Sequence, residues 1–310
     1  MPPNLRAFAR TLALASSLFL LGSFGLRARD RWFTPTFRVL FFDVGQGDSA
    51  LLQLPSGHRW LIDGGGAFWE KDVGRQTLAE LTARGVLTID ALVLSHPDAD
   101  HGEGFRPLFK NLRIEDFWFH FTEKPLLREL MARAALTRTP LRDVAGPTSV
   151  AEKGMSLEFF PVQGDGTNNR ALVVRAALAN CSVLFTGDLE REGERRLREA
   201  NAHWPRPTVL KVAHHGSRTS STPEFLHRWA ARFAVISSGS QNQYGHPNAM
   251  VVERLRQFRS TVLRTDFHGW IEFEFFPDST YRCESAVGAC GEGSCLTGHP
   301  SSPPPRNPRP

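Results

Sequence analysis

The sequence has few cysteines, little net charge and no apolar run as long as a typical membrane span. Four cysteines among 310 residues cannot form a dense disulfide scaffold, so the fold must rest on the burial of apolar side chains. With 26 glycines and 21 prolines, the chain is neither collagen-like nor of low complexity. A net charge of +5 is too small to indicate nucleic-acid binding by itself. The hydrophobic content of 41% instead fits one large core or two modest ones.

The two ends of the chain differ from the rest in composition. Residues 1–30 have a basic start, with Arg6 and Arg10, followed by an uncharged run of sixteen residues over 11–26. This pattern is typical of a signal peptide or an N-terminal membrane anchor, and a buried N-terminal helix is the alternative. We therefore expect a location that is periplasmic, extracellular or membrane-anchored and facing outward. Residues 281–310 contain a proline-rich end, and we expect this tail to be disordered.

Three of the four cysteines lie in that tail. An oxidising location outside the cytoplasm would let two of Cys283, Cys290 and Cys295 form a disulfide. Cys181 begins an apolar segment, so we expect it to be a free thiol in the core.

Between these ends, residues 31–280 alternate short β-rich runs with helical patterns. Strands joined by glycine turns come first, and strands that alternate with helices follow. This order predicts an α/β fold in which helices cover two mixed sheets. The expected strands are 37–42, 49–54, 59–62, 91–94, 157–160, 171–178, 182–185, 208–213, 233–236, 261–263 and 270–276, and the expected helices are 76–84, 125–136, 190–200, 223–231 and 247–258.

The strongest chemical signal is the segment 95–102, which follows an apolar strand. It places His96, Asp98, Asp100 and His101 within six residues. Imidazole and carboxylate groups together are ligands for zinc, manganese or iron(II). In such a loop, one pair of neighbouring side chains, His96 and Asp98, can turn toward one ion while Asp100 and His101 turn toward a second. A polar loop with helix-capping aspartates is the alternative.

A second carboxylate, Asp188, follows another expected strand and a glycine turn. By itself it indicates the N-cap of a helix. Together with the segment 95–102, however, it indicates a metal ligand, because a two-metal centre needs a bridging carboxylate from elsewhere in the chain.

Two further segments carry histidines. His214 and His215 follow the expected strand 208–213, and adjacent residues on a strand point to opposite faces, so we expect only one of them to bind a metal. The other would orient a ligand or contact the substrate. His246 precedes the expected helix 247–258, where a helix-start or core role would be its ordinary interpretation if it stood alone.

Together these segments resemble the metallo-β-lactamase superfamily, and within it the C-terminal domain of the ComEC-type DNA-uptake competence proteins. The resemblance covers residues 37–276 and keeps the order of the family's motifs. It implies an αββα four-layer sandwich and a hydrolase domain over 31–280. The motifs that carry it are Phe42-Asp-Val-Gly-Gln-Gly-Asp-Ser49, Leu61-Ile-Asp-Gly-Gly65, Ser95-His-Pro-Asp-Ala-Asp-His101, Leu184-Phe-Thr-Gly-Asp188, Leu210-Lys-Val-Ala-His-His-Gly-Ser217 and Gln243-Tyr-Gly-His-Pro247.

For the site, the resemblance implies two divalent ions, zinc or manganese, bridged by Asp188. It implies catalytic roles for Asp100 and His246. Asp63 is expected to lie behind the ligands and to orient the metal loop. Asp48 is expected to support the site in the same way, although a plain hairpin turn explains it equally well. The metal ligands that the resemblance implies are His96, Asp98, Asp100, His101, Asp188, His214 and His215.

Two positions depart from the broad superfamily. Asp98 stands where the usual loop has a histidine, and the ComEC-like branch also has aspartate there. The superfamily's separate histidine before the bridging aspartate has no counterpart, because His120 lies among aromatic residues and is expected to be structural. Asn168 and Asn169 stand where the ComEC-like branch carries asparagine. We therefore expect the first metal position to have few ligands.

The resemblance implies a metal-dependent hydrolase, and we expect a phosphodiesterase that acts as a nuclease on DNA outside the cytoplasm. Arg170, Arg218 and Arg264 lie close in sequence to the site segments and offer phosphate contacts. The alternatives are an exported phosphocholine esterase, another metallo-hydrolase of cell-surface polymers, or a non-catalytic binding module. The 310 residues contain no polytopic membrane region, so we expect any DNA-uptake channel to be a separate membrane partner.

Overall fold

The computed structural model describes residues 35–66 and 73–296. The expected export segment, residues 1–30, and the end of the expected tail, 297–310, lie outside these described residues. Within the described ranges, no helix is long and apolar enough to cross a membrane.

One sheet has nine strands, and the first three strands of the chain lie at its centre. β1, β2 and β3 are antiparallel neighbours, whereas β3, β5, β7 and β8 run parallel to one another. The C-terminal strands extend this sheet beyond β1 by antiparallel pairing. From edge to edge the order is β18 (Gly288–Ser294), β17 (Thr280–Ser285), β16 (Ile271–Phe275), β1 (Phe37–Phe41), β2 (Ala50–Gln53), β3 (Arg59–Ile62), β5 (Ala91–Val93), β7 (Phe117–Phe119) and β8 (Leu141–Asp143).

The other large sheet has seven strands, antiparallel on one side and parallel on the other. Its parallel half, from β12 to β15, is linked by helical segments, as parallel neighbours require. The order is β15 (Thr261–Arg264), β14 (Phe233–Ile236), β13 (Val209–Lys211), β12 (Cys181–Phe185), β11 (Leu172–Leu178), β10 (Met155–Pro161) and β9 (Thr148–Glu152). A small parallel pair joins β4 (Thr88–Ile89) to β6 (Arg113–Ile114).

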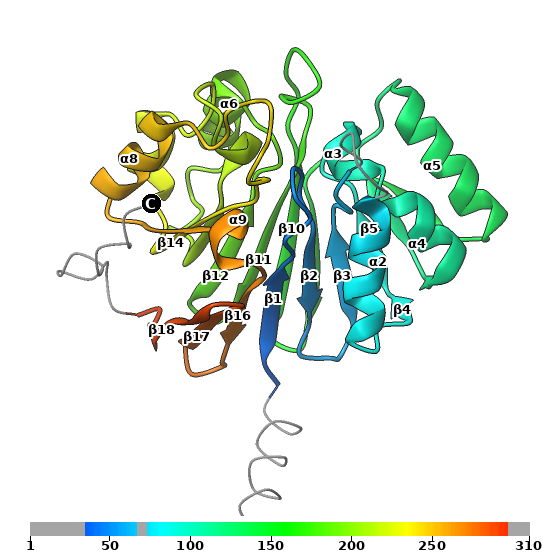
Figure 1. Ribbon diagram of the computed structural model, residues 1–310, viewed down its shortest axis with the longest axis horizontal. Helices are drawn as coiled ribbons and strands as arrows, with labels where there is room; N and C mark the ends of the chain where they lie inside the picture. The colour runs from blue at the N-terminus through cyan, green and yellow to red at the C-terminus, as the bar shows by residue number, and fades with distance from the viewer. Residues whose placement is uncertain (1–34, 67–72, 297–310) are drawn as a thin grey trace, which may run out of the picture. The chain divides into compact units, whose positions relative to one another are not determined.

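Helices cover the outer face of each sheet, so the domain has four layers (Figure 1). Helices α2, α4 and α5 pack on the nine-stranded sheet, and α6, α7 and α8 pack on the seven-stranded sheet. The predicted αββα sandwich is therefore confirmed. The helical segments are α2 (Val73–Ala83), α3 (Ala99–Gly102), α4 (Phe105–Asn111), α5 (Pro125–Leu136), α6 (Arg191–Ala200), the short 3-10 turn η1 (Ala213–Gly216), α7 (Pro223–Trp229), α8 (Ala249–Gln257) and α9 (Thr265–His268).

Three apolar cores separate the four layers. The middle core lies between the sheets, where the rings of Phe41 and Phe185 are 5.7 Å apart. The second core joins the nine-stranded sheet to its helices through Phe117, which contacts Phe105 edge to face. The third, around Trp229, lies under α6, α7 and α8. With both faces covered, the central strands are buried almost continuously, which positions their loops rigidly.

The prediction of a disordered tail is wrong for residues 281–296. This segment forms β17 and β18, and it extends the nine-stranded sheet. Tyr281 and Cys283 point into the core from alternate positions of β17. Composition near the proline-rich end obscured this short alternating pattern, which is the usual signature of a strand with one buried face.

The prediction that Cys181 is a free thiol is also wrong. Cys181 forms a disulfide with Cys295, which lies 114 residues further along the chain. Cys283 and Cys290 form a second disulfide, which closes the β17–β18 hairpin. The pairing of Cys181 depends on where the C-terminal hairpin packs against the other sheet, which local sequence patterns do not show.

Candidate metal centre

The metal loop predicted over 95–102 lies at the carboxyl end of β5. Because β3 and β5 are parallel and end side by side, Asp63 after β3 lies next to this loop. The Ser95 backbone N–H donates to Asp63 Oδ1 at 2.8 Å, and the Ser95 hydroxyl donates to Oδ2 at 2.7 Å. The loop then forms the short helix α3, which carries Asp100 and His101.

The remaining candidate ligands follow the parallel strands of the second sheet. β12 and β13 also end side by side, with Phe185 opposite Lys211. The loop after β12 carries Asp188, and η1 after β13 carries both histidines. The His214 backbone N–H donates to the Gly187 carbonyl at 3.2 Å, which ties the two loops together. Strand ends of both sheets thus meet at one edge, where open α/β sheets bind ligands.

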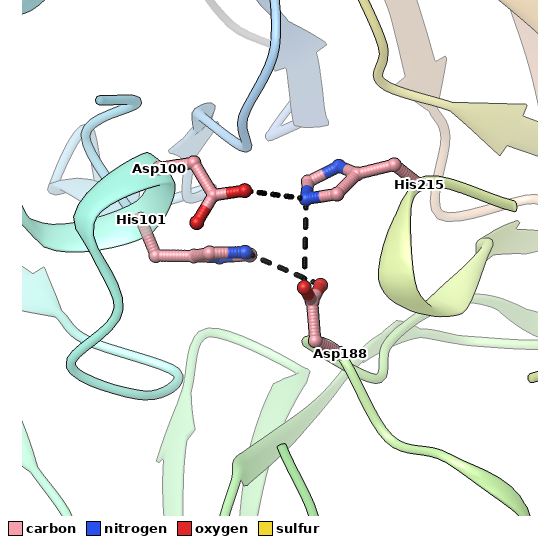
Figure 2. A group of neighbouring side chains, drawn as sticks. All are labelled: Asp100, His101, Asp188 and His215. Atoms are coloured by element: carbon pink, nitrogen blue, oxygen red, sulfur yellow. Dashed lines mark hydrogen bonds and ion pairs between the residues drawn. The ribbon is translucent and has the colours of Figure 1, made fainter. Parts of the chain in front are cut away.

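Four of these side chains meet in one cluster (Figure 2). One ligand atom from each of Asp100, His101, Asp188 and His215 lies within 4.8 Å of all the others. His215 Nε2 is 3.1 Å from Asp100 Oδ2 and 3.5 Å from Asp188 Oδ2. His101 Nε2 is 3.2 Å from Asp188 Oδ1. Two imidazoles and two carboxylates therefore converge from both sheets.

His96 and Asp98 form a second group of candidate ligands next to this cluster. His96 Nε2 is 3.7 Å from Asp98 Oδ2 and 3.9 Å from Asp188 Oδ2. The His96 side chain is buried, and the rings of His96 and His101 are 4.1 Å apart. The carboxylate of Asp188 thus faces both groups of candidate ligands.

Several buried polar atoms in this cluster have no hydrogen-bond partner among the described residues. They are His96 Nε2, His101 Nε2 and Asp188 Oδ1. Buried polar groups in folded proteins are normally paired, so atoms left over in one place need an explanation. A cation with nitrogen and oxygen ligands would use all three, and imidazole with carboxylate is a donor set that zinc and manganese accept. The residues present therefore fit a divalent metal.

A carboxylate and a backbone carbonyl fix the orientation of the two clustered histidines. Asp63 Oδ2 lies 2.8 Å from His101 Nδ1, and the Ser237 carbonyl lies 2.9 Å from His215 Nδ1. An acceptor at Nδ1 keeps the proton on that nitrogen and leaves Nε2 for a metal. Asp63 adopts a positive φ of 57°, and in this conformation its side chain contacts both Ser95 of the loop and His101. It thus lies where the sequence predicted an orienting carboxylate.

Asp48 lies beneath the cluster and forms a buried ion pair with Lys211. Its other oxygen is 3.3 Å from His215 Nδ1, and His101 Nδ1 is 3.7 Å from the carboxylate. Lys211 was not among the predicted site residues. The signal that marks it is a single lysine at the end of the otherwise apolar strand β13, where a buried ammonium requires a partner.

Glycines in the two motifs around Asp48 and Asp63 allow their loops to press against α3. A Cβ atom on Gly47 would lie 2.3 Å from the Asp100 carbonyl oxygen. A Cβ on Gly66 would lie 2.3 Å from the Asp100 Cα. The Asp48 backbone N–H donates to the same Asp100 carbonyl at 3.1 Å. Any other residue at either glycine would displace the backbone that carries Asp100.

Mutual attraction of opposite charges determines the electrostatics of the cluster. Burial alone would raise the pKa of Asp188, but the charges on His215 and His101 lower it well below its ordinary value. Burial opposes a charge on His215, yet Asp188 and Asp48 raise its pKa to about 10. Burial and the nearby His101 lower the pKa of His96 to about 3. The carboxylates also raise the pKa of His101, against the effect of its burial, so the cluster as a whole favours positive charge, which a divalent metal would supply.

The alternation argument for His214 and His215 does not apply, because neither residue lies on the strand. β13 ends at Lys211, and both histidines adopt left-handed backbone angles in η1. They nevertheless differ. His215 is buried in the four-residue cluster, whereas His214 is partly exposed, with Nε2 3.8 Å from Asp188 and Nδ1 3.4 Å from Glu190. Glu190 was also missed by the sequence analysis, and its nearness to Asp188 in sequence was the available signal.

His246 lies at the rim of the cluster rather than within it. Its ring is 5.5 Å from the ring of His214 and 6.4 Å from that of His215. The ring of Tyr244 also stacks on that of His246, with the ring centres 5.7 Å apart. Burial, together with the charges of His215 and His214, lowers the pKa of His246 to about 4.

The two asparagines and His120 lie apart from the four-residue cluster. Asn168 Nδ2 is 3.5 Å from His214 Nδ1, and Asn169 binds backbone groups at the start of α6. His120 is near the Val144 carbonyl and Gln163, at 3.0 and 2.9 Å.

Comparison with known proteins agrees with this fold. A family model described as the metallo-beta-lactamase superfamily matches residues 42–239. A solved structure, the metallo-beta-lactamase fold protein YhfI from Bacillus subtilis, superposes with a TM-score of 0.50 at 14% identity. That match covers 74% of this chain and 96% of the other, and it bears on the fold alone.

Two other proteins are more similar in sequence. ComE operon protein 3 of Bacillus subtilis (strain 168) is 30% identical over 255 residues, which is 76% of this chain and 33% of that protein. Competence protein ComA of Neisseria gonorrhoeae is 32% identical over 240 residues, 76% of this chain and 32% of that protein. The chain thus spans about a third of the length of these relatives.

Proposed function

The chain belongs to the metallo-beta-lactamase superfamily of metal-dependent hydrolases, and from this premise we propose that it is a phosphodiesterase, a nuclease that cleaves DNA outside the cytoplasm. The observation that carries the proposal is the buried cluster of Asp100, His101, Asp188 and His215. Its acidic and imidazole groups come from two sheets and leave ligand atoms without partners among the described residues.

We assign two metal positions, zinc or manganese, to this cluster. Asp100, His101 and His215 would hold one ion, His96 and Asp98 would hold the other, and Asp188 is close to both groups of ligands. Ions so placed would supply positive charge to a phosphate and lower the pKa of bound water toward neutrality. The position at His96 and Asp98 has fewer candidate ligands, and His214, 3.8 Å from Asp188, is the nearest further imidazole among the described residues.

The protein's own groups prepare this site in three ways. Asp63 and the Ser237 carbonyl keep the Nε2 atoms of His101 and His215 turned toward Asp188. The Asp48–Lys211 pair balances charge beneath the cluster. We place His246 in contact with the substrate, because it lies at the rim and its buried Nδ1 has no partner among the described residues.

DNA is the proposed substrate because one of the similar proteins is named a competence protein and because the sequence motifs resemble those of the DNA-uptake competence proteins. A location outside the cytoplasm is supported by the two disulfides and by the basic, then apolar, composition of residues 1–30. A separate membrane channel is the partner that we propose for DNA uptake. Fusion of alkaline phosphatase after Phe33 tests the location: the fusion should be active, and an inactive, stable fusion would argue for a cytoplasmic protein.

The reaction is tested with purified full-length protein loaded with zinc or manganese. We expect it to cleave single-stranded or duplex DNA, to lose activity with a chelator, and to recover when metal is returned. Asp188→Ala should abolish cleavage and lower bound metal, because no other described carboxylate faces both groups of ligands. Circular dichroism checks that the variant is folded.

Two outcomes would overturn parts of this proposal. Intact DNA with metal-loaded wild type, together with hydrolysis of a phosphocholine ester, would replace the nuclease with an esterase of surface polymers. Cleavage that survives in Asp188→Ala would contradict the two-metal assignment while leaving the substrate in place.

A further inference from the structure

A hollow of 480 Å³ lies beside the metal centre at the start of α6. Glu190 links the two, because its carboxylate is 3.4 Å from His214 Nδ1 while His214 Nε2 is 3.8 Å from Asp188. The volume is in the range of sites that hold a nucleotide-sized ligand. The lining residues are Asn169, Glu190, Arg191, Glu192, Arg218 and Thr219.

The two carboxylates that line this hollow interact with other side chains, whereas its two arginines form no ion pair with a described residue. Glu192 is bound by two arginines of its own helix, Arg195 and Arg196, at 2.8 Å each. Glu190 accepts a hydrogen bond from Thr219 and faces His214. The exposed side chains of Arg191 and Arg218 form no ion pair with any residue in the described ranges. Two guanidinium groups are therefore available to an anion.

A backbone hydrogen bond joins the two segments that carry these arginines. The Arg191 N–H donates to the Thr219 carbonyl at 3.1 Å, so the start of α6 and the segment that carries Arg218 are joined. The buried Asn169 accepts hydrogen bonds from the N–H groups of Glu190 and Gly193, at 3.1 and 2.9 Å. Such preorganisation lowers the entropic cost of binding a charged ligand.

We propose that this hollow binds the phosphate next to the one that is cleaved, through Arg191 and Arg218. The inference rests on the proposed function and deepens it, because it assigns the enzyme to polymers with consecutive phosphodiesters. A guanidinium matches two phosphate oxygens at once, and the open hollow lets a strand continue past it. A small phosphodiester would occupy the metal centre alone.

The test compares two substrates of the full-length, metal-loaded protein. One is a short single-stranded DNA oligonucleotide, and the other is bis(p-nitrophenyl) phosphate, which has a single phosphate. Arg191→Gln and Arg218→Gln should each lower the ratio of kcat/KM for the oligonucleotide to that for the small diester about fivefold near 0.1 M salt. Each should also reduce the slope of log affinity against log salt by about 0.7. Arg198→Gln, on α6 but outside the hollow, is the matched control and should keep both values.

A neutral methylphosphonate placed next to the cleavage site identifies the phosphate. With wild type it should reduce oligonucleotide cleavage as much as the arginine variants do, and in the double variant it should cause no further loss. Additive losses would show that the arginines bind elsewhere and would overturn the inference. Equal losses on both substrates, or none on the oligonucleotide, would overturn it as well.

Failure of the proposed function gives a different result. If metal-loaded wild type hydrolyses neither substrate, the phosphodiesterase proposal fails. The affinity for a labelled oligonucleotide, measured by fluorescence anisotropy, then tests phosphate binding by the hollow independently of hydrolysis. Weaker binding and a smaller salt slope in Arg191→Gln and Arg218→Gln, but not in Arg198→Gln, would support it, and unchanged binding would refute it.

Discussion

Lys211 and Asp48, 163 residues apart in sequence, form a buried ion pair next to the candidate metal centre. The lysine ends β13 in one sheet, and the aspartate lies in the turn between β1 and β2 of the other. The pair therefore joins the two sheets at the edge where the candidate ligands converge. Because Asp48 also faces His215 and His101, the pair couples the packing of the sheets to the geometry of the site.

Removing the lysine should destabilise the protein strongly. Lys211→Met leaves the buried carboxylate of Asp48 without its main counter-charge, which typically costs about 3–5 kcal/mol of unfolding free energy. The double variant Lys211→Met/Asp48→Asn should recover part of this loss, because it leaves no unpaired charge. Urea unfolding followed by circular dichroism measures both. The exposed Lys110→Met is the control, and a loss no larger than that of the control would contradict the coupling.

The two adjacent histidines should differ in their effect on metal content. His215 is buried in the four-residue cluster, so His215→Ala should lower the metal stoichiometry and the rate together. His214 is partly exposed and lies outside that group, so His214→Ala should keep the ion held by Asp100 and His101. Metal analysis by mass spectrometry after gel filtration measures the stoichiometry. Equal metal loss in both variants would mean that the two histidines serve as equivalent ligands.

The sequence was sufficient to identify most candidate residues of the site and the type of fold. The metal loop could be found because its four polar residues are contiguous and follow an apolar strand. Asp188 and the pair of His214 and His215 could be found because each also follows a strand, and strand ends of α/β sheets lie at one edge. Which of the two histidines is the ligand could not be decided from the sequence. Central strands such as β12 were visible because they are buried along their whole length.

What the sequence could not show depends on long-range packing. The pairing of Lys211 with Asp48, and of Cys181 with Cys295, follows from how the two sheets face each other. Edge strands were missed for another reason. Every residue of β8 is exposed, and β9 has no fully buried residue, so neither has the apolar pattern that marks a strand. The backbone angles of His214 and His215 likewise broke the strand alternation assumed for them.

A buried carboxylate outside the metal centre, Glu194, should make stability depend on pH. It accepts hydrogen bonds from the backbone of Ser221 and from Thr222, which hold the start of α7 against α6. Burial raises its pKa above the ordinary value of 4.5, although these hydrogen bonds partly oppose the shift. A raised carboxyl pKa favours the protonated folded state, so its stabilisation is present below pH 4.5 and is lost as pH rises through the folded pKa.

The comparison that isolates this effect is wild type against Glu194→Gln. The unfolding free energy of wild type relative to the variant should fall as pH rises from 4.5 toward neutrality. Urea unfolding at a series of pH values measures it. Glu199→Gln, on the exposed side of the same helix, shows how much of the change comes from surface charge. A difference that grows with pH would contradict the raised pKa.

The two disulfides should contribute unequally to stability. In the chain-entropy account, a disulfide stabilises by restricting the unfolded chain, and the effect increases with the length of the closed loop. The Cys181–Cys295 bond closes 114 residues and the Cys283–Cys290 bond closes 7, a difference of about 2.5 kcal/mol in that account. Cys181→Ala/Cys295→Ala should therefore lower the melting temperature more than Cys283→Ala/Cys290→Ala.

Differential scanning calorimetry of the oxidised variants measures this order, and mass spectrometry of alkylated protein confirms that the remaining bond is formed. The longer loop also joins the start of β12 to the C-terminal hairpin, and β12 leads directly into the loop that carries Asp188. Reduction of both disulfides in wild type should give the same melting temperature as a variant in which all four cysteines are replaced by alanine. Equal destabilisation by the two pairs would show that local packing around each bond, rather than loop closure, determines their contribution.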